Sequence, residues 1–317
     1  MSNSSDIVPQ SGPGSATPAA MPIESAVTDR RYRSRPYYWS VRRELWENRS
    51  IYIAPLIVAA VELVGFFVSI IGLPERRRAA LLLEPLKQRA AIELPYDMVA
   101  MIMILTAFIV GLFYCLDALH GERRERSILF WKSLPVSDLA TVLTKASIPI
   151  VILPLLAVVI ALITEWMMLL ISTATLLIRG QAVWAFWSRL PIFTMWSGML
   201  FHFFCVHGLW QSPIYGWLIM VSAWARRVPI LWAVLPPLAI GFCEKAAFNT
   251  AHFGDLIGSR FTGGPEGSAI MEHTVAGTNM MPSSAHFFIS PGLWIGFAIT
   301  AAFLAAAVRL RRYRGPN

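Results

Sequence analysis

The chain has 317 residues, of which 56% are hydrophobic and only 15% are charged, and its mean hydropathy is +0.56. Soluble domains are usually about 45–50% apolar and about 25% charged, so the composition excludes an ordinary soluble protein and predicts an all-α polytopic membrane protein. The net charge of +8 is then expected at the ends of membrane spans, and no nucleic-acid partner is predicted.

The N-terminal region divides into two parts. Residues 1–29 are rich in Ser, Pro and Ala and contain no apolar run of the kind a secretory signal needs, so we expect a disordered cytoplasmic leader. The next part, 30–50, contains the sequence PYYWSVRRELWENRS. Its aromatic and aliphatic residues at helical spacing are Tyr38, Trp39, Val41, Leu45 and Trp46. This pattern predicts an amphipathic interfacial helix among lipid headgroups, with Arg42 as an exception within the apolar stripe; the alternative is a plain cytoplasmic flank.

Six segments are long and apolar enough to cross a membrane as helices, which takes about 20 residues each. They are roughly 51–72, 98–119, 146–171, 195–224, 228–248 and 292–310. Pro213 predicts a kink in the fourth, because proline removes a helical hydrogen bond. We therefore expect one six-helix domain over 51–313, with a long outer loop at 249–291.

The distribution of Lys and Arg predicts the orientation of the spans. With the N-terminus inside, the inner segments hold eighteen of these residues and the outer segments hold eight. Positive charge accumulates on the cytoplasmic side of membrane proteins, so both termini are predicted to be cytoplasmic. The segment 75–89, ERRRAALLLEPLKQR, departs from this trend, and we expect it to form a short interfacial helix outside.

Motifs for soluble catalytic chemistry are absent from the sequence. No GxxxxGK[ST], HExxH or GxSxG pattern occurs. The three cysteines fall in apolar runs without CxxC spacing, which predicts neither a disulfide framework nor a zinc site. We therefore expect no catalytic residue, metal or cofactor in this chain.

Four ionisable residues fall within the predicted spans: Glu62, Glu165, Glu244 and Lys245. A charge at the centre of a bilayer costs about 2.5–3.5 kcal/mol even on the most lenient scale, so each should face protein or water. They are candidates for the lining of a translocation path; the alternative is a structural ion pair. Lys245 is expected to pair with Glu165 or Glu62 across a helix interface.

The segment 120–145, between the second and third spans, combines charge with an apolar patch. GERRER is expected to be solvated, SILFWKSL is apolar and ends at Pro135, and Ser137 or Asp138 can cap the helix that follows. An apolar patch in the cytosol is costly to leave in water, which favours a partner protein over another segment of this chain or lipid headgroups.

This segment, with SLPVSD, resembles the permease subunits of type-2 ABC transporters, as does the stretch 212–240, SPIYGWLIMVSAWARRVPILWAVLPPLAI. The resemblance implies a permease, in the bacterial inner membrane and with a preference for export. Two identical or related chains would form the pathway, and separate ATP-binding subunits would carry ATP and Mg²⁺. It also implies that a cytoplasmic coupling helix between the second and third spans docks on the ATP-binding subunit. The residues expected to dock are Glu122, Arg123, Arg124, Glu125, Arg126, Ile128, Leu129, Phe130, Trp131, Leu134 and Pro135.

Two other functions remain open from the residues alone. One is a membrane enzyme that uses Glu62 or an outer histidine such as His273. The other is a membrane scaffold that binds partners and transports nothing.

Overall fold

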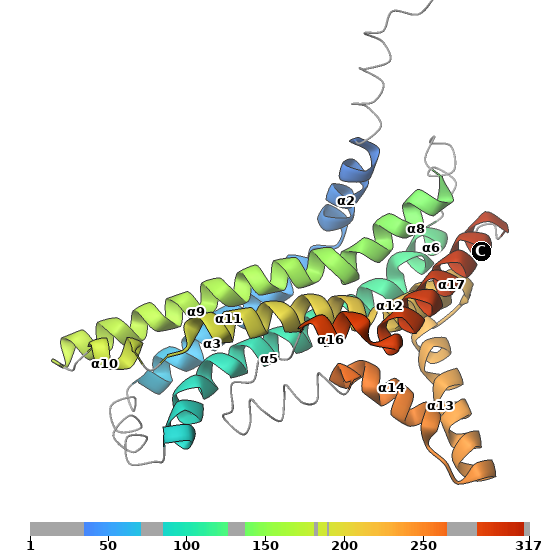
Figure 1. The fold of residues 1–317 in the computed structure, drawn as a ribbon. Helices are drawn as coiled ribbons and strands as arrows, with labels where there is room; N and C mark the ends of the chain where they lie inside the picture. Colours follow the sequence, from blue (N-terminus) through green and yellow to red (C-terminus); the bar gives the residue numbers. More distant parts are fainter. Residues whose placement is uncertain are drawn as a thin grey trace, which may run out of the picture.

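The computed structural model describes residues 35–70, 85–125, 137–180, 183–188, 190–264 and 284–313, and all regular structure among them is helical (Figure 1). The predicted leader 1–29 lies outside the described residues. Within the described residues, six helical stretches are long and apolar enough to cross a membrane, which agrees with the predicted number. They are Ser50–Ser69, Glu93–Arg124, Asp138–Ile178, Ile192–Trp210, Pro229–Phe248 and Pro291–Tyr313.

The first two spans enter from opposite ends of the bundle. Helix α2 (Arg35–Glu47) leads into α3 (Ser50–Ser69) through two residues, and Figure 1 shows α2 turning away from the axis of α3. Helix α5 (Pro85–Ala118) runs back and is followed by the short α6 (His120–Arg124). Of the segment 75–89, predicted to be interfacial, residues 75–84 lie outside the described part and 85–89 begin α5.

The third span is one long helical element of three parts. Helix α8 (Asp138–Ser147), the π-helix η2 (Ile148–Ile152) and α9 (Leu153–Ile178) together cover 41 residues. At 1.5 Å per residue this is about 60 Å, roughly twice the thickness of a bilayer core. Pro149 lies in the first turn of η2 and Pro154 in the first turn of α9. Each lacks the N–H that a regular helix would use, which favours the wider π turn.

The fourth span is interrupted as predicted. Helix α11 (Ile192–Phe201) and the π-helix η3 (His202–Trp210) end at Gln211, and α12 (Ser212–Trp224) begins with Pro213 in its first turn. Gly208 of η3 faces η2 so closely that a Cβ atom there would lie 2.7 Å from the carbonyl oxygen of Ile150. The two π-helical segments therefore meet backbone to backbone in the core.

Helices α3, α5, α9 and α12 share one apolar core, and α17 (Pro291–Tyr313) packs along α12. Buried side chains of this core include Met103, Leu153, Phe203 and Tyr215, each fully covered. The close approach of α12 and α17 requires a small residue: a Cβ at Gly216 would already lie 3.4 Å from the Cα of Thr300. A short helix, α10 (Val183–Trp187), follows α9 at the far end of the bundle (Figure 1).

The predicted outer loop 249–291 contains two helices, α14 (His252–Thr262) and α16 (Ser284–Ile289), while 265–283 lie outside the described residues. Helix α13 (Pro229–Phe248) and α14 form a hairpin that projects from the bundle (Figure 1). The turn passes through Asn249 in a left-handed conformation, with φ of 51°. Only Ala233 of α13 is buried, so this span presents almost its whole surface outward.

Candidate functional site

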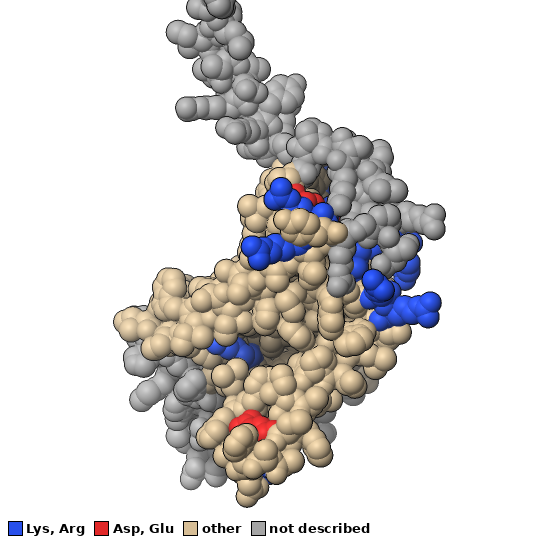
Figure 2. Space-filling view, turned by 90° about the vertical axis from the view of Figure 1, so that its right-hand side faces the viewer, with Lys and Arg blue, Asp and Glu red and all other residues tan. Residues whose placement is uncertain are grey.

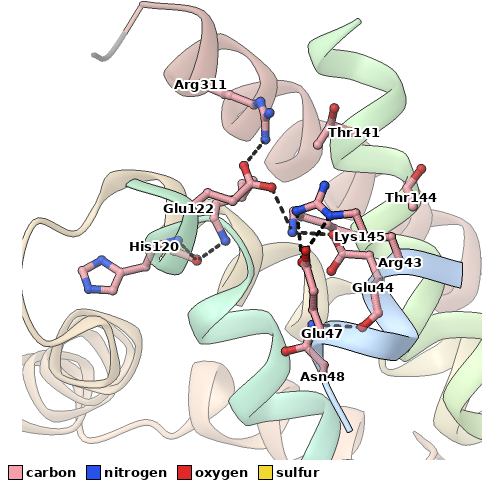
Figure 3. Close-up of polar contacts among 12 residues, drawn as sticks. Arg43, Glu44, Glu47, Asn48, His120, Glu122, Thr141, Thr144, Lys145 and Arg311 are labelled. Atoms are coloured by element: carbon pink, nitrogen blue, oxygen red, sulfur yellow. Dashed lines mark hydrogen bonds and ion pairs between the residues drawn. The ribbon is translucent and has the colours of Figure 1, made fainter. Parts of the chain in front are cut away.

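Buried charged side chains gather where α2, α6, α8 and α17 meet (Figure 3). We call this group the end cluster; its members are Glu44, Tyr114, Glu122, Asp138, Lys145 and Arg311. Four of the charged members are almost completely covered: Glu44 is 4% exposed, Glu122 8%, Lys145 3% and Arg311 6%. The start of the chain's described part and the end of α17 therefore lie at the same end of the bundle.

Ion pairs connect the end cluster in series. Lys145 Nζ lies 2.8 Å from Glu44 Oε1 and 3.2 Å from Glu122 Oε1. Arg311 Nη1 lies 2.6 Å from Glu122 Oε2, and Arg311 Nε lies 3.0 Å from Asp138 Oδ1. The Tyr114 hydroxyl donates to Glu44 Oε2 over 2.9 Å. Desolvating a charge costs several kcal/mol, and these short contacts supply the compensation that burial requires.

Arg311 connects the two ends of the segment 126–136. Glu122 precedes residues 126–136, which lie outside the described part, and Asp138 follows them. Both carboxylates bind the same guanidinium. The two spans joined by this segment are thus held together at its base, by a side chain from the last helix.

A second set of contacts fixes α6 against α12. The Ser222 hydroxyl accepts from the backbone N–H groups of Leu119 and His120 at 3.0 and 2.9 Å, which satisfies donors at the start of α6. Arg123 Nη2 donates to the carbonyl oxygens of Ser222 and Ala225, the latter at 2.8 Å. The end of α12 and the turn that follows are therefore tied to the same end of the bundle.

The docking residues predicted from the sequence divide into three groups. Glu122 and Arg123 are buried, which overturns the expectation that the whole GERRER stretch is solvated; the helices that cover them come from distant parts of the chain. Arg124 and Glu125 are exposed, with side-chain exposures of 64% and 68%. The others lie outside the described residues: Arg126, Ile128, Leu129, Phe130, Trp131, Leu134 and Pro135. Their contact with a partner stays a prediction.

The helix after this segment begins as predicted. The Ser137 hydroxyl accepts from the backbone N–H of Ala140 at 3.1 Å, so Ser137 is the N-cap of α8. Asp138 in the first turn adds a negative charge where the helix dipole favours it. Five members of the end cluster were not singled out from the sequence as site residues. These are Glu44, Tyr114, Asp138, Lys145 and Arg311, of which Asp138 was considered only as a helix cap; the position of these residues near the ends of the predicted spans was the available signal.

The predicted ion pair of Lys245 is not present in the described part of the chain. Lys245 is exposed on α13, and Glu165, only 3% exposed, accepts a hydrogen bond from Trp196 Nε1 at 2.9 Å. Both carboxylate oxygens of Glu62 are buried, and neither has a hydrogen-bond partner among the residues that the structure describes.

Glu244 has a local role at the α13–α14 turn. Its carboxylate accepts from Thr250 Oγ1 at 2.8 Å and from the backbone N–H groups of His252 and Phe253 at 2.8 and 2.9 Å. The first N–H groups of a helix lack partners within it, so Glu244 completes the start of α14. The side chain is used for the hairpin and does not pair with Lys245.

The other end of α14 is held by Arg260, which is 8% exposed. Its guanidinium stacks over the Trp210 ring, with 4.5 Å from Cζ to the ring centroid. It also donates to the carbonyl oxygens of Trp210 and Gly292 at 3.3 and 2.8 Å. A Cβ at Gly296 would lie 2.7 Å from Arg260 Nη1, so this small residue leaves space for the guanidinium.

Comparison of the chain with family models, with curated proteins and with solved structures finds no match. A functional assignment therefore depends on the chain's own residues and their arrangement.

Proposed function

We propose that the chain is the permease subunit of an ATP-driven ABC transporter of the bacterial inner membrane, with both termini in the cytoplasm and a preference for export. Two permease chains form a dimer around the pathway. A separate ATP-binding subunit binds to the permease and carries ATP and Mg²⁺. Support comes from the six candidate spans and from the likeness of 120–145 and 212–240 to type-2 permeases. The end cluster supplies the mechanical argument.

The observation that carries the proposal is the contact of Arg311 with both Glu122 and Asp138. A coupling element must pass a displacement to the membrane spans without yielding at its base. Because one buried guanidinium holds both ends of the 126–136 segment, a force on that segment reaches α5 and α8 together. Lys145 and Glu44 extend the connection to α2.

The third span gives this displacement a path across the membrane. Helices α8, η2 and α9 are continuous, so movement of Asp138 is carried along about 60 Å of helix. The π-helical turn at η2 packs on η3, where a change of helical register is least costly. In this mechanism ATP-driven closure of the partner tilts α9 relative to the rest of the bundle and changes access to the pathway.

Co-purification with an ATP-binding subunit tests the proposal. The full chain is expressed in the membrane of its native cells and purified, and the amount of P-loop ATPase bound per permease is measured. Replacing Phe130 and Trp131 by Ser is expected to release the ATPase while insertion is unchanged. Trp184→Ser, in α10 at the other end of the bundle and 82% exposed, is the matched control. If both variants retain the ATPase equally, docking through 126–136 is wrong.

The alternatives give different results in the same preparation. A membrane enzyme would keep its partner and lose its activity on Glu62→Gln. A scaffold would bind the ATPase, yet ATP would drive no flux in vesicles and would not change the conformation of the chain.

A further inference from the structure

Helix α2 carries an exposed aromatic and cationic face. Trp39 is 55% exposed and Trp46 68% exposed. Between them in sequence, the guanidinium of Arg42 stacks over both indole rings, with 5.2 and 5.0 Å from Cζ to the ring centroids. The spacing of i−3 and i+4 brings all three side chains onto one side of the helix.

This face retains the two tryptophans of the predicted stripe but not its two aliphatic residues. Val41 and Leu45, expected in the lipid-facing stripe, pack against the core of the bundle, and Glu44 turns inward to Lys145. Arg42, the exception in the sequence pattern, lies instead on the outward face with the two tryptophans. The two faces of α2 are thus divided between the bundle and the surroundings.

Arg43, the residue next to Arg42, already pairs with a carboxylate of its own helix. Arg43 Nε lies 2.6 Å from Glu47 Oε1, and Arg43 Nη2 donates to Glu47 Oε2 at 3.0 Å. The second carboxylate of α2, Glu44, is committed to Lys145 and Tyr114. Within the described part of the chain, no carboxylate pairs with Arg42. Stacking on the indoles uses the flat faces of the Arg42 guanidinium and leaves the N–H groups at its edge available for an anion. Two of these N–H groups can donate to two oxygens of one phosphate.

The exposed face of α2 lies next to the first candidate membrane span. Two residues separate α2 from α3, whose outward side chains continue the exposed surface: Ile53 is 41% exposed, Leu56 52% and Ile57 57%. Figure 2 views the molecule end-on, and it shows most of the visible Lys and Arg in the upper part of this face with an almost uncharged surface below them. A phosphate that reaches Arg42 from beside α3 belongs to a lipid headgroup at the edge of the bilayer.

We propose that Trp39, Arg42 and Trp46 form a binding site for the phosphate of an anionic phospholipid headgroup. The indoles occupy the interfacial zone and hold the guanidinium edge at headgroup depth, while the acyl chains lie along α3. The site goes beyond the transport proposal and does not depend on it. Through Glu44 and Lys145, a lipid bound here also steadies the end cluster.

Lipid retention by the full chain tests this site. The protein is purified from nanodiscs of phosphatidylcholine with phosphatidylglycerol, and bound lipid is counted by native mass spectrometry. Arg42→Gln is expected to weaken phosphatidylglycerol retention about tenfold, as for the loss of a charged hydrogen bond. Arg43→Gln removes the same charge from a residue already paired with Glu47 and should leave retention unchanged.

A second variant keeps the test decisive if Arg42→Gln unfolds. Trp39→Leu with Trp46→Leu alters only exposed side chains and should also reduce retention. Equal loss for the Arg42 and Arg43 variants would mean nonspecific attraction and overturn the site. Displacement of the lipid by millimolar glycerol phosphate would instead indicate a soluble ligand. Undiminished lipid with loss of a co-purifying subunit would make the face a protein interface, and would equally overturn the proposal.

Discussion

The end cluster and the α13–α14 hairpin hold helices together in opposite ways. At the end cluster, buried charges from four helices are paired with one another, so no helix can leave without exposing an unpaired charge. The hairpin is attached to the bundle without ion pairs among the described residues, through the stacking of Arg260 on Trp210, a hydrogen bond from Trp217 Nε1 to the Ala233 carbonyl and aromatic contacts such as Phe108 with Phe261, and α13 buries only Ala233. The difference indicates that the end cluster moves as one unit while the hairpin can shift by itself.

The largest expected effect is at the centre of the end cluster. Lys145→Met leaves Glu44 and Glu122 buried without their shared cation and should reduce the free energy of unfolding by about 3–5 kcal/mol. Thermal unfolding in detergent measures this. Arg43→Gln, at an ion pair with side-chain exposures of 29% and 51%, should cost less than about 1 kcal/mol. Equal midpoints for the two variants would contradict the role given to the cluster.

Arg260→Met should weaken the hairpin locally. The loss of two hydrogen bonds from a charged donor is expected to cost about 1.5–3 kcal/mol. The expected readout is faster hydrogen exchange over 252–262, with unchanged protection in α5 and α9. Asp255→Asn, on the exposed part of α14, is the control. A global loss of protection would show that the hairpin is not an independent unit.

Substitutions at two glycines test how tightly the bundle and the hairpin are packed. Gly208→Ala forces a Cβ against the Ile150 carbonyl, 2.7 Å away, and overpacking of this kind costs about 1–3 kcal/mol. At Gly241 of α13 the nearest atom, from Phe253, is 3.9 Å away, so Gly241→Ala should be neutral or stabilising by up to about 1 kcal/mol. Chemical unfolding of both variants measures the change in the free energy of unfolding and its sign. The reverse order would mean that the hairpin is the more tightly packed region.

The smallest effect is expected for Glu244→Gln. The amide keeps one acceptor and loses the charge that faces the first N–H groups of α14. Hydrogen exchange of the backbone N–H groups of residues 252 and 253 should become faster, while exchange at 258–262 is unchanged. Uniform change along α14 would argue against a capping role.

Hydrophobic length and local capping were predictable from the sequence. Six apolar runs gave six spans, Ser137 gave the start of α8, and Pro213 marked the interruption of the fourth span. Each of these depends on residues within one or two helical turns.

The burial of the end cluster was not predictable in the same way. Arg311 meets Glu122 across 189 positions of sequence, and Arg123 meets Ser222 across 99. A sequence pattern does not specify which distant helix will cover a charge, so GERRER resembled a solvated stretch. Val41 and Leu45 of α2 were misassigned for the same reason: periodicity defines the faces of a helix but not which one meets the bundle.

The proposed coupling role of Arg311 has a direct test that needs no knowledge of the substrate. Nitroxide labels at positions 94 and 177, exposed by 58% and 64% at the far ends of α5 and α9, report their separation in the full complex with its ATPase. Trapping with ATP and vanadate should change this distance in the unmodified chain. Arg311→Met should abolish the change while the ATPase stays bound. The same change with and without Arg311 would contradict the account.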